Sequence, residues 1–197
     1  MIKLGITGGI ASGKSTASKH LSKKKLTYIF DADKESKKLL KASIQTQKEI
    51  IALFGNKIIK DNSIDFKLLS YEVFSNQDKQ KSLNNIMWPK VNDLINKTCK
   101  EISHENYILF IVDAALLFEA NFTPFFDKVL LILTDDSKRI ERAIERDTLS
   151  KETIYDRMKL QMPEIKKKEL ADIVITNNDG LSALMKKLDQ LYLDLLK

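Results

Sequence analysis

The residues best suited to chemistry lie at positions 8–15, where the sequence GGIASGKS matches the pattern G-x-x-x-x-G-K-S/T. In this pattern the chain leaves a strand, turns its backbone N–H groups toward a phosphate and enters a helix whose N-terminus is partially positive. Lys14 can then reach the β- and γ-phosphates, and the hydroxyl group of Ser15 can bind Mg²⁺. The segment therefore predicts a site for ATP. The residues expected to contact ATP are Gly9, Ala11, Ser12, Gly13, Lys14, Ser15 and Thr16.

Acidic residues follow two apolar runs of the kind that form buried strands. Asp113 closes the run YILFIVD, and Asp31 and Asp33 follow the run TYIF. Because ligands bind at the carboxyl ends of parallel strands, we expect Asp113 to hold Mg²⁺ through a water molecule. We expect Asp33 to accept or orient the proton of an acceptor hydroxyl group. The alternatives are a solvated strand end for Asp113 and a helix cap for Asp31 or Asp33.

Three arginines, Arg139, Arg142 and Arg146, recur at spacings that place them on one face of a helix. Such a helix can close over ATP and stabilise the charge that develops during phosphoryl transfer. We assign this role to Arg142. Ion pairing with the interleaved Glu141 and Glu145 is the alternative.

The elements that would position these residues alternate between apolar runs and segments of helical period. Five apolar runs with few internal charges predict strands that are covered on both faces. They lie at positions 2–7, 27–31, 107–113, 128–134 and 173–176. Strands alternating with helices favour right-handed crossovers and a parallel sheet. We therefore predict an α/β fold, a three-layer P-loop NTPase core with a five-stranded parallel sheet.

The interval between the second and third runs is far longer than one crossover helix needs. It predicts an inserted all-helical domain at about residues 34–105, with a turn at Gly55 and 61–63. We also expect a bend between two helices at Trp88-Pro89, because proline disfavours helical geometry in the residue before it.

Composition and charge narrow the classes of function. The formal net charge of +6 attracts polyanions, but no basic run is as long as a binding tail or alternates with aromatic residues. The one cysteine, Cys99, excludes an intramolecular disulfide. The sequence shows neither a cleavable signal pattern nor an apolar run of membrane-spanning length. We expect a cytoplasmic protein, a monomer or weak homo-oligomer, that binds neither nucleic acid nor a membrane.

The phosphate-binding pattern occurs together with further short motifs along nearly the whole chain. They are GITGGIASGKST at 5–16, DAD at 31–33, FG at 54–55, VF at 73–74, LLFE at 116–119, Arg142 with Arg146-Asp147, Arg157 with Gln161, and ADIVITN at 171–177. In this combination the sequence resembles the bacterial dephospho-coenzyme A kinase family.

The resemblance implies a single P-loop kinase domain with an inserted substrate domain at about residues 34–105. Its nucleotide-binding core would comprise residues 1–33, 106–136 and 171–197, and its helical lid about residues 137–170. The reaction it implies is transfer of the γ-phosphoryl group of MgATP to the ribose 3′-hydroxyl group of dephospho-coenzyme A. In that reaction Asp33 is the acceptor-side base, Arg142 serves the lid, and Asn177 lies beside the adenine of ATP. Lys14 joins Asp33 and Arg142 as a catalytic residue. The residues expected at the acceptor are Thr7, Asp33, Leu116, Leu117, Phe118 and Glu119.

The sequence departs from the usual family pattern mainly at three positions. Trp88 stands where the family has histidine, Ala115 where it has proline, and Phe66 where it has arginine. These departures bear on contacts with the acceptor and leave the phosphate-binding loop unchanged.

Three other functions stay open at this point. The first is another P-loop kinase that acts on a nucleoside or a nucleoside monophosphate. The second is a nucleotide-dependent switch, which needs a guanine-reading Asn/Thr-Lys-x-Asp motif that Asn177-Asn178-Asp179 does not match. The third is a nucleic-acid-binding protein, which predicts steeply salt-dependent binding.

Overall fold

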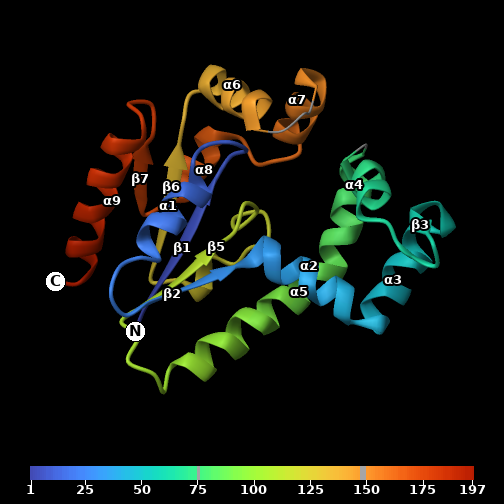
Figure 1. Ribbon diagram of the computed structural model, residues 1–197, viewed down its shortest axis with the longest axis horizontal. Helices are drawn as coiled ribbons and strands as arrows, with labels where there is room; N and C mark the ends of the chain where they lie inside the picture. The colour runs from blue at the N-terminus through green and yellow to red at the C-terminus, as the bar shows by residue number, and fades with distance from the viewer. Residues whose placement is uncertain (75, 147–149) are drawn as a thin grey trace. The chain divides into compact units, whose positions relative to one another are not determined.

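Five parallel strands form one sheet in the computed structural model, which describes residues 1–74, 76–146 and 150–197 (Figure 1). The strands are β1 (Ile2–Gly8), β2 (Thr27–Asp31), β5 (Leu109–Asp113), β6 (Lys128–Leu133) and β7 (Ile173–Thr176). Their order is β2-β5-β1-β6-β7, and each neighbouring pair is parallel. Each of the five apolar runs matches one of these strands to within two residues at either end, so the predicted sheet is confirmed.

The described residues divide into two compact units. The first, which we call the sheet unit, comprises Met1–Asp31 and Lys97–Lys197, and the second, the insertion unit, comprises Ala32–Asn96. The helices that lie wholly in the sheet unit are α1 (Lys14–Leu21), α6 (Asp136–Arg146), α7 (Lys151–Lys159), α8 (Glu164–Leu170) and α9 (Leu181–Leu195). A short 3₁₀ helix, η2 (Thr123–Phe125), also belongs to it.

Side chains alternate between the two faces of the sheet. Leu4 and Ile6 of β1 are fully buried and pack in one cluster with apolar side chains of α1 and α9, such as Leu21 and Leu188. On the opposite face the segment after β5 approaches β1 so closely that a Cβ atom at Gly5 would lie 2.6 Å from Leu117 Cδ1. The sheet is therefore covered on both faces, as its apolar strands predict.

The insertion unit is mainly helical but contains a hairpin. Its elements are α2 (Ala32–Ala42), α3 (Ile44–Phe54), η1 (Asn56–Ile58), β3 (Ile59–Lys60), β4 (Ser63–Ile64), α4 (Phe66–Phe74) and the first part of α5 (Gln77–Ile102). Asp61 and Asn62 both have positive φ angles, 50° and 60°, in the turn between the two strands. Two central residues with positive φ, often Asp or Asn, suit a tight hairpin. The turn is where the sequence predicts it, but the expectation of an entirely helical insertion is wrong here.

The expectation of two separate helices at Trp88-Pro89 is also wrong, because α5 is a single helix with Pro89 inside it. Proline in a helix interior removes one backbone hydrogen bond and costs about 3 kcal/mol. Met87, Val91 and Ile95 follow one another at intervals of four residues and are all buried. Burial of this stripe along one helix face outweighs the cost of the proline.

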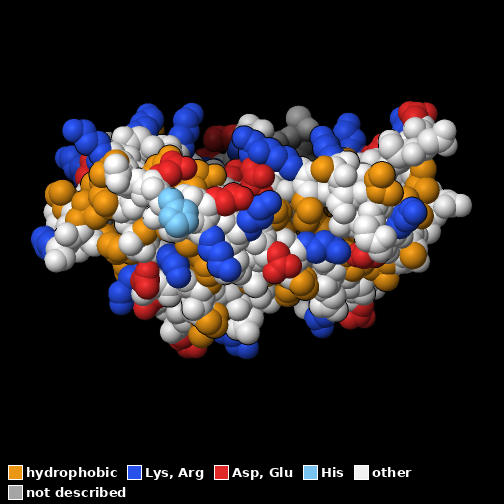
Figure 2. All heavy atoms as spheres, turned by 90° about the horizontal axis from the view of Figure 1, so that it is seen from below, with side chains coloured by type: hydrophobic (Ala, Val, Ile, Leu, Met, Phe, Trp, Pro, Cys, Tyr) orange, Lys and Arg blue, Asp and Glu red, His pale blue; other side chains and the backbone are white. Residues whose placement is uncertain are grey.

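Basic and acidic side chains are interspersed on the face of the molecule drawn in Figure 2. Carboxylates therefore lie between the basic groups on that face, although the whole chain has a formal net charge of +6. In the described part of the chain, no helix combines the length and the apolar character that a membrane crossing needs.

Candidate active site

The predicted phosphate-binding loop joins the end of β1, at Gly8, to the start of α1, at Lys14. A hydrogen bond of 3.1 Å from the backbone N–H of Ser12 to the carbonyl oxygen of Gly9 closes the loop. Gly13, the residue before α1, has a left-handed conformation with φ of 99°, which glycine adopts without strain. The strand, loop and helix thus follow in the order that phosphate binding requires.

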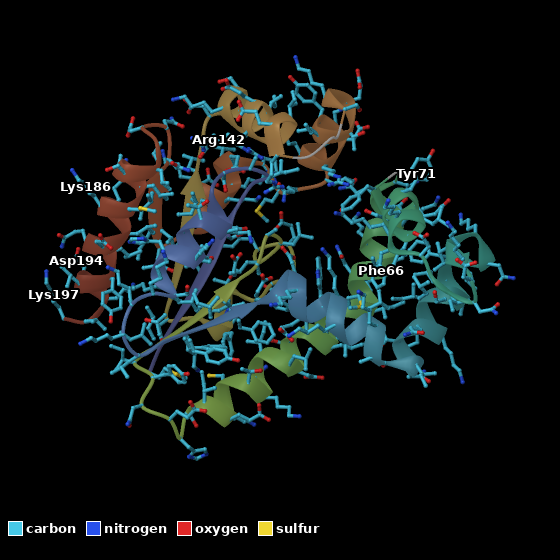
Figure 3. All side chains as sticks on the ribbon, viewed as in Figure 1. Phe66, Tyr71, Arg142, Lys186, Asp194 and Lys197 are labelled. Atoms are coloured by element: carbon cyan, nitrogen blue, oxygen red, sulfur yellow. The ribbon has the colours of Figure 1, made fainter. Side chains whose placement is uncertain are left out.

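The carboxyl ends of β6 and β7 hold this loop through Ser12. The carbonyl oxygen of Ser12 accepts hydrogen bonds from Asn177 Nδ2 at 2.8 Å and from Thr134 Oγ1 at 2.9 Å. A Cβ atom on Gly13 would collide with the same Asn177 amide group. Arg142, labelled in Figure 3, donates from Nη2 to the carbonyl oxygen of Asn177 at 3.1 Å. Asn177 therefore connects Arg142 with the loop. The contact of Thr134 with the loop could not be predicted, because no motif in the sequence includes Thr134.

Lys14 and Asp113 form an ion pair at the carboxyl edge of the sheet. Asp113 ends β5 and is buried, and its register partner on β2 is Asp31. The strand-end position predicted for Asp113 is therefore confirmed, with Asp31 beside it on the neighbouring strand. The role of Asp113 toward a metal ion stays a prediction.

The residues predicted to bind Mg²⁺ offer suitable donor atoms. Ser15 is exposed in the first turn of α1, one residue after Lys14, whose ammonium group contacts Asp113. Mg²⁺ prefers oxygen ligands and is commonly bound by one or two protein oxygens together with substrate phosphates. No group of three or more His, Cys, Asp or Glu side chains suited to a metal occurs in the described ranges. The residues thus fit an ion that arrives with the triphosphate.

Asp33 lies in the first turn of α2 and belongs to the insertion unit. Its side chain is exposed, two residues after Asp31 at the end of β2. The predicted role of Asp33 as the base stays a prediction.

The segment 116–119, predicted to contact the acceptor, contains two kinds of side chain. Leu117 and Phe118 are buried, which favours packing roles for these two residues. Leu116 and Glu119 keep part of their surface exposed. Of the four residues predicted in this segment, Leu116 and Glu119 are therefore the two that solvent can reach.

Thr7, also predicted at the acceptor, is fully buried in β1. Its hydroxyl group donates to the carbonyl oxygen of Ala115 at 3.3 Å. The backbone N–H of Ala114 donates to the carbonyl oxygen of Ile6 at 3.0 Å. Thr7 thus helps to fix the point at which the chain enters segment 116–119.

The backbone of Ile10 in the loop is held on both sides by side chains that the sequence did not assign to it. Arg139 of α6 is 2% exposed, and its Nε donates to the carbonyl oxygen of Ile10 at 3.0 Å. The N–H of Ile10 donates to Gln161 Oε1 at 3.1 Å. Arg139 also donates from Nη1 to Asp136 at 3.0 Å and to Glu164 at 3.2 Å. Arg139 therefore forms ion pairs, as the alternative prediction for these arginines has it. Its partners are Asp136 and Glu164, not Glu141 or Glu145.

A fully buried lysine lies next to these residues. Lys167 Nζ is 3.8 Å from Oε1 of Glu119 and 3.8 Å from Oε1 of Glu164. Burial lowers the pKa of Lys167, and the two carboxylates oppose this shift only partly. Glu119 Oε1 also accepts the backbone N–H of Met162 at 2.7 Å. Asp147, the last residue of one family motif, lies outside the described residues.

Comparisons with known proteins give matches that cover nearly the full length of the chain. A family model described as dephospho-CoA kinase matches residues 2–183. The dephospho-CoA kinase of Fusobacterium nucleatum is 41% identical over 188 residues, which cover 95% of each chain. A crystal structure from Thermus thermophilus matches with a TM-score of 0.81 and 28% identity, covering 98% of this chain and 97% of that one. Dephospho-CoA kinase from Campylobacter jejuni matches with a TM-score of 0.70 and 27% identity, covering 98% and 96%.

Proposed function

The chain belongs to the dephospho-CoA kinase family, and we propose that it transfers the γ-phosphoryl group of ATP to the ribose 3′-hydroxyl group of dephospho-coenzyme A, giving coenzyme A. The observation that carries this proposal is the loop at residues 8–15, with Lys14 and Asp113 paired at its base. The family match covers the insertion unit and most of the sheet unit, and thereby supports the acceptor as well as the nucleotide.

The nucleotide side of the proposed reaction uses the loop and the two charged groups at its base. The loop N–H groups and Lys14 hold the phosphates, and Ser15 and Asp113 hold Mg²⁺, which neutralises phosphate charge when it is bound. Because Lys14 and Asp113 are already paired, each charged group is kept near the position where it is needed. Arg142 acts as part of the lid, and Asn177 lies beside the adenine of ATP. A hydrogen bond from Arg142 to the carbonyl oxygen of Asn177 joins these two residues.

The acceptor side uses Asp33 as the base that accepts or orients the proton of the 3′-hydroxyl group. Leu116 and Glu119 are the members of segment 116–119 with exposed surface for the acceptor. Little covalent chemistry falls to the protein in such a reaction, so positioning and charge stabilisation supply most of the rate.

The setting of the reaction is the remaining part of the proposal. We propose that the protein works in the cytoplasm, as a monomer or weak homo-oligomer, with the two small-molecule substrates as its partners. Because no basic run in the sequence is as long as a binding tail, we propose that nucleic acid is not a partner.

The direct test is incubation of the purified protein with MgATP and dephospho-coenzyme A. ADP release is followed together with the mass of the acceptor, and adenosine and AMP are offered in parallel reactions. We expect dephospho-coenzyme A to gain one phosphoryl group and Lys14→Ala to abolish the gain. Phosphorylation of AMP or adenosine in preference to dephospho-coenzyme A would contradict the proposal.

A further inference from the structure

Polar contacts in the sheet unit form a closed ring around the start of the phosphate-binding loop. Glu119, after β5, contacts Met162 and Lys167, and Lys167 contacts Glu164 within α8. Glu164 accepts from Arg139 of α6, and Arg139 donates to Ile10 of the loop. The N–H of Ile10 donates to Gln161, the neighbour of Met162, and this contact closes the ring.

The ring occupies both backbone polar groups of Ile10, its N–H through Gln161 and its carbonyl group through Arg139. These two groups belong to successive peptide units, 9–10 and 10–11, and neither unit can rotate without breaking its bond. Ile10 follows Gly9, at which a Cβ atom would collide with Arg139 and Glu164. The first half of the loop therefore takes its shape from side chains outside the loop.

Charges within the ring balance. Arg139 and Lys167 supply two cations, and Glu119 and Glu164 supply two carboxylates. The side chains are 3%, 0%, 14% and 23% exposed, in that order. Lys167 Nζ has no hydrogen-bond partner among the described residues and contributes through its charge, 3.8 Å from each carboxylate. Loss of that charge would leave the poorly solvated carboxylates of Glu119 and Glu164 without a neighbouring cation that both now share, a costly arrangement.

We propose that Lys167 is a positioning residue for ATP: by balancing Glu119 and Glu164 it keeps Arg139 and Gln161 bound to Ile10, and so fixes the first half of the phosphate-binding loop. The ammonium group of Lys167 pairs with Glu119 and Glu164, and neither of these residues is predicted to contact ATP or the metal ion. The proposal rests on the proposed function, since it assigns ATP to this loop.

The test compares Lys167→Met with Lys166→Met and Lys168→Met, which remove the same group from exposed positions on the same helix. The dissociation constant of a non-hydrolysable ATP analogue with Mg²⁺ is measured by calorimetry, and KM for dephospho-coenzyme A is measured separately. We expect Lys167→Met to weaken nucleotide binding about tenfold, the scale of coupling within one polar network. Both control variants should change the dissociation constant and the acceptor KM less than about twofold, within the error of additivity.

The double variant Glu164→Gln/Lys167→Met separates positioning from folding. It removes one charge of each sign and keeps an amide oxygen that can accept from Arg139, so it should regain most of the nucleotide affinity. If Lys167→Met does not fold, the double variant should fold and bind nucleotide. Wild-type affinity in a folded Lys167→Met protein, or no recovery in the double variant, would overturn the proposal. Failure of the wild type to phosphorylate dephospho-coenzyme A would instead refute the proposed function, and the nucleotide-binding comparison would still apply.

Discussion

The ammonium group of Lys14 and the carboxylate of Asp113 form an ion pair between the start of α1 and the end of β5. The side chains are only 11% and 6% exposed, so water screens the two charges weakly. Removing one partner from such a pair leaves the other charge poorly solvated. The pair thus links the stability of the sheet unit to the two groups that the proposed reaction needs.

Lys14→Met should lower the free energy of unfolding by about 3 kcal/mol in the absence of nucleotide, because Asp113 loses its partner. It should also lower kcat at least about 100-fold, the usual effect of removing a charge-stabilising group. Adding Asp113→Asn should recover part of the lost stability and none of the activity. Urea unfolding and steady-state rates measure the two effects. Strictly additive losses of stability in the double variant would show that the pair carries no coupling.

Asp33→Asn should abolish most turnover while leaving the affinity for an ATP analogue within about twofold. An amide of the same shape cannot accept the hydroxyl proton, and a missing general base costs about 10²- to 10⁴-fold in rate. Glu35→Gln is the matched control, since Glu35 lies in the same first turn of α2 and pairs with Lys38. Loss of nucleotide binding in Asp33→Asn, or an equal loss of rate in both variants, would argue against Asp33 as the base.

The strands and the loop could be predicted from the sequence because their signals are local. A strand covered on both faces must be apolar along its whole length, and the loop needs glycine and lysine at fixed spacing. The expectation that the helix ends at Pro89 is wrong for a physical reason. Proline does destabilise a helix, but burial of Met87, Val91 and Ile95 stabilises α5 by more than proline costs. Tertiary packing of this kind cannot be weighed from propensity alone.

The supports of the loop could not be predicted because they join distant parts of the chain. Arg139 lies 129 residues from Ile10, and Gln161 lies 151 residues from it. The spacing places Arg139 on the same helix face as Arg142, but spacing alone does not reveal that Arg139 is buried. Lys167 lies in the basic run at 166–168, where nothing in the sequence distinguishes it from its exposed neighbours.

Gly9→Ala should weaken the binding of ATP about tenfold or more. The new methyl group would collide with the Arg139 guanidinium group and the Glu164 carboxylate, which hold each other in place. A shift of these groups disturbs Ile10, and a small misplacement at such a site can cost about 100-fold in rate. The control is Ala11→Gly in the same loop, where φ is already 58° and glycine relieves strain. Normal affinity in Gly9→Ala would show that Arg139 can move without consequence for the loop.

Pro89→Ala should raise the free energy of unfolding by about 1–3 kcal/mol. Alanine restores a backbone N–H donor inside α5 and is the best helix former. Pro89 is exposed, so little packing is lost when its ring is removed. Urea unfolding at neutral pH measures the change, and kcat should stay within about twofold of the wild type. A destabilised variant would show that the ring makes contacts that outweigh the missing hydrogen bond.

The buried ammonium group of Lys167 should make stability rise with pH on the alkaline side of neutrality. Burial lowers its pKa in the folded protein below the ordinary value of 10.5 that it has in the unfolded chain. Between those two values the unfolded chain holds a proton that the folded protein has released, so the free energy of unfolding increases with pH. Below the folded-state pKa both states are protonated, and the full cost of burying the charge is present.

The measurement is urea unfolding of the wild type and Lys167→Met at several pH values from neutral toward 10.5. The difference in unfolding free energy, wild type minus variant, should grow with pH by at most about 1.4 kcal/mol per unit, the limit for one proton. Subtracting the variant cancels the titration of other groups, and Lys166→Met, at an exposed position of α8, should follow the wild type. A difference that stays constant over this range would mean that Lys167 titrates alike in the folded and unfolded states. Its burial would then be offset fully by Glu119 and Glu164.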